Sequence, residues 1–129
     1  MTIPPVTSYS DNPKVDELVN ELIGRVADKW TLLIIEALEE HGETRFGVLG
    51  RLIPRISQKM LTQTLRSLER DGLLTRSVTP SVPVRVDYEL TPLGGTLMPL
   101  IAAIKSWAET HMPEVQTARS VYDATSAPA

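Results

Sequence analysis

One amphipathic segment, residues 57–72, limits what this chain can fold into more than any other feature. Its leucines recur at intervals of four and three, the spacing of a narrow apolar stripe along a helix. They are Leu61, Leu65 and Leu68. Ser57 can cap the first turn, and Gly72 can adopt the left-handed conformation that ends a helix. The segment is therefore predicted to be a helix with one face in a core and the other free for a partner.

The opposite face of this helix carries hydrogen-bonding and basic side chains, with no acid before Glu69. These side chains are Gln58, Lys59, Thr62, Gln63 and Arg66. Donors and acceptors of this kind suit hydrogen bonds to base edges and phosphates. Residues 45–52 predict a shorter helix, and residues 53–56 a turn. Together they predict a helix-turn-helix over residues 45–72, although a plain antiparallel helix pair fits the spacing about as well.

The distribution of charge separates these two readings. Residues 45–85 hold eight basic residues and two acids, whereas the rest of the chain holds five basic residues and fourteen acids, for a net charge of −3. An acidic protein with one basic third has a localised positive patch, as expected where phosphates are bound. The charge pattern therefore favours a nucleic-acid interface.

Length and composition indicate one globular domain of 129 residues with its own core. The chain is cysteine-free, which excludes disulfides and thiolate metal sites, and its two histidines give a metal site little support. We expect no cofactor. The first residues lack the features of a signal peptide, and no apolar run is long enough to cross a bilayer, so a cytoplasmic protein without membrane contact is expected.

Before the helix-turn-helix, residues 1–12 predict a flexible arm, and Asn12-Pro13 predicts the start of a helix. The apolar stripe of this first helix is wider than one small domain needs, which suggests a subunit contact. Its members at that contact are Val15, Leu18, Val19 and Leu22. Residues 28–40, with Asp28 as the cap of the first turn, are apolar on most faces and predict the central core helix.

After the helix-turn-helix, residues 73–90 alternate with period two and predict two strands joined by a loop at 79–83. The apolar positions expected to face inward are Leu74, Val78, Val84, Val86, Tyr88 and Leu90. A hairpin directly after a recognition helix is a wing. Its loop is expected to lie beside that helix, with Arg85 at the base of the loop and Arg76 as a further candidate across from it, near the DNA backbone or minor groove.

Residues 91–112 predict a last helix, in which Pro99 causes a bend or a new start, and residues 113–129 a flexible tail. The apolar stripe of this helix adds a second predicted dimer surface: Leu97, Ile101, Ile104 and Trp107. The predicted fold is mainly α with a small β-hairpin. It is a winged helix-turn-helix domain over residues 13–112, with dimerisation helices at both ends.

Several segments together resemble the bacterial HxlR-type transcriptional regulators, a winged helix-turn-helix group related to the MarR-type regulators. The matching segments span roughly residues 15 to 110. They are 28–34 in the core helix, Arg45-Phe46, 56–63 with 65–69 in the recognition helix, 71–73, and the wing end 83–94.

The resemblance implies a homodimer whose first and last helices pack across a two-fold axis. Its recognition helices would enter successive major grooves of a pseudo-palindromic operator, with half-sites about 34–36 Å apart. Some members of the family sense electrophiles or oxidants through a cysteine in the first helix. This chain departs there, since Glu17 or its neighbours stand where the thiol would be, and that mechanism is excluded.

The expected DNA contacts follow from side-chain chemistry. Gln63 can pair with adenine, Lys59 and Arg66 with guanine or phosphate, and Arg85 is the wing contact. Phosphate contacts are expected from Ser57, Arg45 and Arg55. Arg51, Arg70 and Arg76 are at least as well explained as solvated surface residues.

The predicted function is therefore sequence-specific binding of double-stranded DNA by a homodimeric transcriptional regulator. A small apolar or aromatic effector is a further expectation, in a cavity lined by Trp30, Ile104 and Trp107. The alternative is a winged helix used for protein–protein interaction, with acidic partners docking on the basic third. An enzyme is not expected, since no nucleophile–base–acid set, phosphate loop or metal-ligand cluster stands out.

Overall fold

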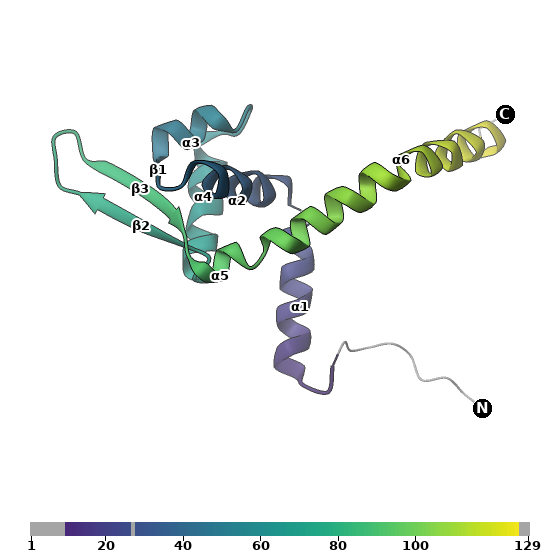
Figure 1. Cartoon of the computed structure of the whole chain (residues 1–129), viewed down its shortest axis with the longest axis horizontal. Coiled ribbons are helices and arrows are strands. Elements are labelled where there is room, and N and C mark those ends of the chain that lie inside the picture. The colour runs from purple at the N-terminus through teal and green to yellow at the C-terminus, as the bar shows by residue number, and fades with distance from the viewer. Residues whose placement is uncertain (1–9, 27, 127–129) are drawn as a thin grey trace. The chain divides into compact units, whose positions relative to one another are not determined.

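The computed structural model describes residues 10–26 and 28–126, with the side chains of residues 22, 23, 25 and 26 outside the description. Two compact units, Met1–Gly95 and Thr96–Ala129, are described separately. The elements of the first unit are α1 (Pro13–Val26), α2 (Lys29–His41), β1 (Thr44–Arg45), α3 (Phe46–Leu52), α4 (Gln58–Arg70), β2 (Leu74–Thr79), β3 (Arg85–Leu90) and α5 (Pro92–Gly95) (Figure 1). The second unit contains α6 (Met98–Ser126).

The starts of the first two helices confirm the capping predicted from the sequence. The Asn12 side chain accepts a hydrogen bond from the Lys14 amide at 2.9 Å, and α1 begins at Pro13. The Asp28 carboxylate accepts from the Trp30 amide at 3.0 Å at the start of α2. The predicted flexible arm, residues 1–12, lies outside the described residues except for its last three, which precede α1.

Helix α2 is the central core helix, as predicted. Its residues Ile34, Ile35 and Leu38 are at most 2% exposed. The buried apolar residues of α3, its following turn, α4 and β2 complete the core of this unit: Leu49, Ile53, Leu61, Leu65, Leu68, Leu73 and Leu74. Gly42, with a φ of 70°, ends α2 and donates its amide to the Leu38 carbonyl.

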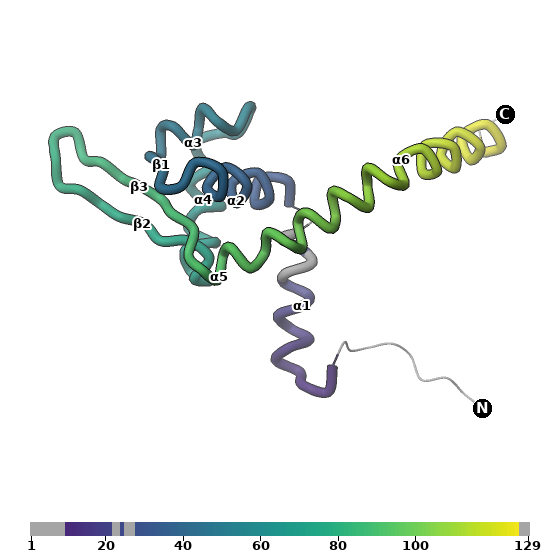
Figure 2. Tube along the Cα trace, viewed as in Figure 1, coloured from purple at the N-terminus to yellow at the C-terminus, as the bar shows by residue number. Residues whose placement is uncertain are grey.

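The sheet has three antiparallel strands in the order β1-β3-β2, one more than the predicted hairpin. Thr44 of β1 pairs with Tyr88, and Leu74 and Thr79 of β2 pair with Leu90 and Arg85. A strand of two residues is too short to show an alternating apolar pattern in the sequence. Strand β1 is therefore defined only by its hydrogen bonds to β3, far along the chain. The hairpin extends beyond the helices in the view of Figure 2.

The predicted inward face of the hairpin is wrong at three positions. Val78 and Val84 are 48% and 62% exposed, because they lie near the hairpin tip, where no helix covers the sheet. Asp87, expected on the outer face, is 5% exposed. Strand β1 pairs along β3 at this position and covers a residue that an isolated hairpin would expose.

Close packing where the wing ends fixes the base of the hairpin. Thr91 donates its hydroxyl to the Gly72 carbonyl at 2.6 Å and its amide to the Leu73 carbonyl at 3.1 Å. A Cβ on Gly94 would collide with the Leu73 carbonyl, so only glycine fits there. The end of β3 is therefore hydrogen-bonded to residues 72–73, which lead into β2.

Helix α6 overturns the expectation of a flexible tail after residue 112. It begins at Met98, so Pro99 lies in its first turn, and it continues through Pro113 to Ser126. The segment after Pro113 contains good helix formers, including Glu114, Gln116 and Ala118, and its threonines and serines do not outweigh them. Residues 127–129 lie outside the described residues. Among the described helices, none has both the length and the apolar character needed to cross a bilayer.

Candidate nucleic-acid interface

The helix-turn-helix consists of α3 and α4, joined by a five-residue turn. The Ile53 amide donates to the Leu49 carbonyl at 3.1 Å and ends α3. Arg55 then adopts a φ of 68°, which reverses the chain. The Ser57 hydroxyl accepts a hydrogen bond from the Met60 amide at 3.0 Å and starts α4. The predicted cap at Ser57 is confirmed, and Gly72, with a φ of 75°, follows the end of the helix.

The two faces of α4 differ as the sequence predicted. The buried face comprises Leu61, Thr64, Leu65 and Leu68. Thr64 donates its hydroxyl to the Met60 carbonyl at 2.8 Å, so this buried oxygen is satisfied within the helix. On the other face Gln58, Lys59, Gln63 and Arg66 are exposed, and Thr62 is half-buried. A rigid helix thus presents amides and cations to solvent.

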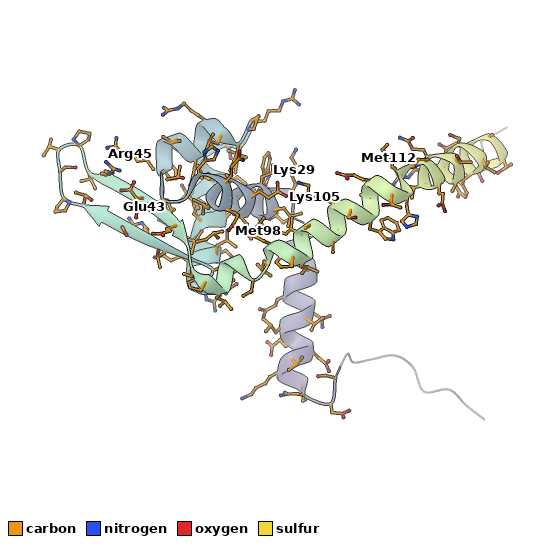
Figure 3. The ribbon with its side chains drawn as sticks, in the orientation of Figure 1. Lys29, Glu43, Arg45, Met98, Lys105 and Met112 are labelled. Carbon is orange, nitrogen blue, oxygen red and sulfur yellow. The ribbon has the colours of Figure 1, made fainter. Side chains whose placement is uncertain are left out.

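The predicted phosphate contacts lie at the edges of this face. Arg45 precedes α3, is exposed, and makes no side-chain capping bond there. Figure 3 shows Arg45 on the side of α3 that faces the hairpin. Arg55 and Ser57 are also exposed, in the turn and at the start of α4.

Arg85, in the last strand pair before the hairpin loop, is held by an acid that the sequence analysis did not pair with it. Its Nε donates to the Asp87 carboxylate at 2.8 Å. This hydrogen bond raises the pKa of Arg85 above its ordinary value, so the guanidinium is charged at any relevant pH. Asp87 is buried and fixes the direction of the Arg85 side chain, and the pair adds no net charge to the wing.

Two cavities lie between the helix-turn-helix and the hairpin. The smaller, of about 270 Å³, is lined by Phe46, Thr62, Arg66, Glu69, Arg76 and Tyr88. The larger, of about 470 Å³, is lined by Arg45, Phe46, Gly47, Arg76, Ser81, Val82, Pro83, Val84, Arg85, Val86 and Tyr88. We call the two together the wing trough, because they share Phe46, Arg76 and Tyr88.

Arg76 belongs to this surface, although the sequence analysis found it at least as well explained as a solvated residue. It lies between Leu74 and Val78 on β2, and it lines both cavities of the wing trough. The period-two pattern already placed Leu74 and Val78 on one face of the strand, and Arg76 shares that face. The alternating pattern of β2 was therefore the sequence signal that could have placed Arg76 on this surface.

The predicted dimer residues lie on α1, on α6 and, for Leu97, in the turn just before α6. Most of them are exposed or half-buried: Val15, Leu18, Val19, Leu97, Ile104 and Trp107. The side chain of Leu22 lies outside the described residues. Ile101 is only 2% exposed in the single chain, and its place at a subunit contact stays a prediction.

The predicted effector residues belong to different units, and the effector site stays a prediction. Trp30 lies in α2 and is half-buried, with Lys29 Nζ 4.7 Å from its ring centroid. Ile104 and Trp107 lie on α6, where the Trp107 ring is 5.0 Å from that of His111. Among the described residues, no group of three or more potential metal ligands comes together.

A two-helix motif followed by a hairpin, with a polar and basic face on its second helix, defines a winged helix-turn-helix domain. The family model described as HxlR-like helix-turn-helix matches residues 25–116. The chain belongs to this family of transcriptional regulators and carries its helix-turn-helix DNA-binding domain.

Relatives agree with this assignment. The chain is 44% identical over 99 residues to the HTH-type transcriptional regulator YtfH of Escherichia coli, covering 77% of this chain and 78% of the relative. Among solved structures, the transcriptional regulator ytfH from Salmonella typhimurium is 40% identical, with a TM-score of 0.68, covering 79% of this chain and 90% of that one. The reduced form of the transcriptional regulator YodB from B. subtilis is 37% identical, with a TM-score of 0.62 and coverages of 78% and 93%.

Proposed function

We propose that this regulator binds double-stranded DNA sequence-specifically as a homodimer, with α4 of each subunit in a major groove. The observation that carries the proposal is the division of α4 into a fully packed leucine face and an exposed face of amides and cations. Because the buried face fixes the helix, the backbone positions that carry Gln63 and Arg66 are set before DNA arrives.

The edges of the helix-turn-helix supply the contacts that position the duplex. Arg45, Arg55 and Ser57 contact phosphates beside the groove, and backbone amides at the start of α4 add to them. Arg85, aimed by Asp87, contacts the adjacent backbone or minor groove from the wing. These contacts are independent of sequence, whereas those of Gln58, Lys59, Thr62, Gln63 and Arg66 read the bases.

Exposed apolar side chains on the terminal helices support the homodimer. Val15 and Leu18 of α1 are 42% and 53% exposed, and Ile104 and Trp107 of α6 are 39% and 60% exposed. Along α6, Ile104, Ala108, His111, Val115, Ala118 and Tyr122 recur at alternating intervals of four and three. That spacing is typical of helices that pack against a partner helix. Two copies joined in this way would bind half-sites about 34–36 Å apart.

Salt dependence of DNA binding tests the proposal. Fluorescence anisotropy with a labelled random duplex, at several salt concentrations, should give a log–log slope near −7 if about eight phosphates are neutralised. A winged helix that binds only acidic protein partners would show no binding to the duplex. Selection of genomic fragments by the purified protein then identifies the operator, and recovery of random fragments would contradict sequence specificity.

The homodimer is tested separately by sedimentation equilibrium. The full chain should sediment at twice its monomer mass, and Trp107→Glu should shift it toward the monomer, because a charge at a buried contact is strongly unfavourable. Lys14→Glu on the exposed surface of α1 is the control and should leave the mass unchanged. A wild-type monomer at micromolar concentration would contradict the proposal.

A further inference from the structure

Charged side chains of opposite sign share one face of the sheet where β1 meets β3. Arg45 of β1 is paired in register with Asp87 of β3, so these two side chains lie on the same face. Side chains two residues apart on a strand also share a face, which places Arg85 beside Asp87. Glu43, directly before β1, shares the face of Arg45 for the same reason, and both are exposed while Thr44 between them is buried (Figure 3). Two cations and two acids therefore meet at this edge of the sheet.

The same four side chains line one cavity of about 320 Å³. Its lining comes from the end of α2, β1, α3 and β3, and contains no residue of α4. With the histidine neutral, the formal charges of the lining cancel, whereas residues 44–68 contain no acid at all. The full lining is His41, Glu43, Thr44, Arg45, Val48, Leu52, Arg85 and Asp87. The positive charge of the basic region is therefore locally offset at this one place beside the hairpin.

The two acids of this cavity differ in what holds them. Asp87 is 5% exposed and accepts a hydrogen bond from Arg85 Nε at 2.8 Å, so it belongs to the packed structure. Glu43 is exposed, and within the described part of the chain its side chain makes no hydrogen bond or ion pair. The pKa of Arg85 is raised chiefly by its hydrogen bond to Asp87, and further by the charges of Asp87 and Glu43. Glu43 thus acts on its neighbours through its charge and has no contact that the fold depends on.

The arginine that Glu43 influences keeps donors for a phosphate. Asp87 occupies Nε of Arg85, and the terminal nitrogens of a guanidinium can still donate to phosphate oxygens. A carboxylate attached to the chain attracts the same cations as a phosphate does, and it also repels the phosphate itself.

We propose that Glu43 weakens DNA binding, because its carboxylate competes with the DNA phosphates for Arg45 and Arg85. This inference rests on the proposed function, in which both arginines contact the DNA backbone. Since backbone contacts are independent of sequence, Glu43 lowers the affinity for any duplex. It thereby limits how tightly the basic region of residues 45–85 holds non-specific DNA.

The first experiment measures binding to a random duplex by fluorescence anisotropy. Glu43→Gln should bind about two- to fivefold more tightly than the wild type at low salt, the size expected for one exposed charge. The gain should shrink as salt rises, because ions screen exposed charges over roughly 10 Å at 0.1 M. Glu39→Gln, which removes the same charge from an exposed position of α2 outside the cavity lining, is the matched control and should change the affinity little. No gain in Glu43→Gln, or an equal gain in Glu39→Gln, would overturn the inference.

Double variants show which side chains carry the effect. The gain from Glu43→Gln should be smaller in an Arg45→Ala or an Arg85→Ala background, because one of the cations that Glu43 acts on is then absent. In a Lys59→Ala background the gain should persist in full, because Lys59 lies on α4 and outside this cavity. The same gain in all three backgrounds would contradict an action through Arg45 and Arg85.

A measurement without DNA separates this inference from the proposed function. Heparin is a polyanion, so the salt concentration that elutes the protein from a heparin column reports the strength of its exposed cations. Glu43→Gln should elute at a higher salt concentration than Glu39→Gln, and co-elution of the two would overturn the inference even if the chain bound no duplex. If Glu43→Gln elutes later but neither it nor the wild type binds any duplex, the proposed function fails while the effect of Glu43 on the arginines stands.

Discussion

Helix α4 and the β2–β3 hairpin, the two parts of this domain proposed to contact DNA, are stabilised in different ways. The helix has four buried residues along one face and capping at both ends. The hairpin is buried only near its base, at Leu74, Asp87 and Tyr88, and every residue from Thr75 to Arg85 is exposed. The helix is therefore positioned by the core, whereas the outer hairpin is positioned only by its own strand pairing.

This difference separates two kinds of DNA contact. Base readout needs a firmly positioned backbone beneath the side chains that read the bases, and the packed leucines of α4 provide one. Backbone contacts tolerate more freedom, and the hairpin tip can supply them. Arg85 is the exception within the hairpin, because Asp87 anchors it at the boundary between the packed base and the free tip.

The largest effect on stability should come from truncating a leucine on the buried face of α4. Leu65 is fully buried, so Leu65→Ala should lower the free energy of unfolding by about 2–5 kcal/mol, measured by chemical denaturation. Gln63→Ala, two residues earlier on the exposed face, is the control and should change it by no more than ~0.5 kcal/mol. Similar losses in both variants would break the distinction between the two faces.

Gln63→Ala, the control for stability, should instead have a large effect on DNA binding. Gln63→Ala should weaken binding to the selected operator by about 1–3 kcal/mol and relax the preference at one base pair, measured by anisotropy on operators varied at each position. Lys59 is expected to contact either a phosphate or a guanine, and Lys59→Ala distinguishes these two roles. If Lys59 binds a phosphate, the slope of log binding constant against log salt concentration should fall in magnitude by about one in the variant. Unchanged operator preference in Gln63→Ala would remove α4 from base readout.

Removing the cap of α4 should have an intermediate effect. Ser57→Ala loses the acceptor for the Met60 amide and should destabilise the fold by about 1 kcal/mol, read from the midpoint of denaturation. Ser57→Asp keeps an acceptor and should restore the stability while repelling phosphate. A stable but DNA-deficient Ser57→Asp variant would sharpen the assignment of this residue to both roles.

The smallest effect is expected at the hairpin tip. Val82 is fully exposed, so Val82→Ala should leave the free energy of unfolding within ~0.5 kcal/mol of the wild type by chemical denaturation. A loss as large as that of Ser57→Ala would mean that the tip is held by packing, and the contrast between helix and hairpin would fail.

Local signals allowed most of the helices to be predicted from the sequence. Asn12, Asp28 and Ser57 cap helices through hydrogen bonds to amides two or three residues away, and Gly42 and Gly72 adopt positive φ where helices end. Such interactions need no knowledge of distant contacts. The apolar stripe of α4 was equally readable, because its buried residues follow directly from the helical period.

The features that the sequence did not reveal depend on contacts between distant segments. Strand β1 exists only because Thr44 and Arg45 pair with β3, and this pairing also buries Asp87. Arg76 became part of the trough through the packing of the hairpin beside α4. The helix after Pro113 was missed for another reason, since composition rich in Thr, Ser and Ala was given more weight than its helix formers.

At the left-handed turn residue Arg55, a substitution can change DNA binding without lowering the stability of the fold. An L-residue at its φ of 68° costs about 1–2 kcal/mol, which glycine would relieve. Glycine also makes the unfolded chain more flexible, at a cost of about 0.4–1 kcal/mol. By these figures Arg55→Gly would leave the fold as stable as before or slightly more stable while deleting a cation, so evolution could tune operator occupancy at this site without endangering the scaffold.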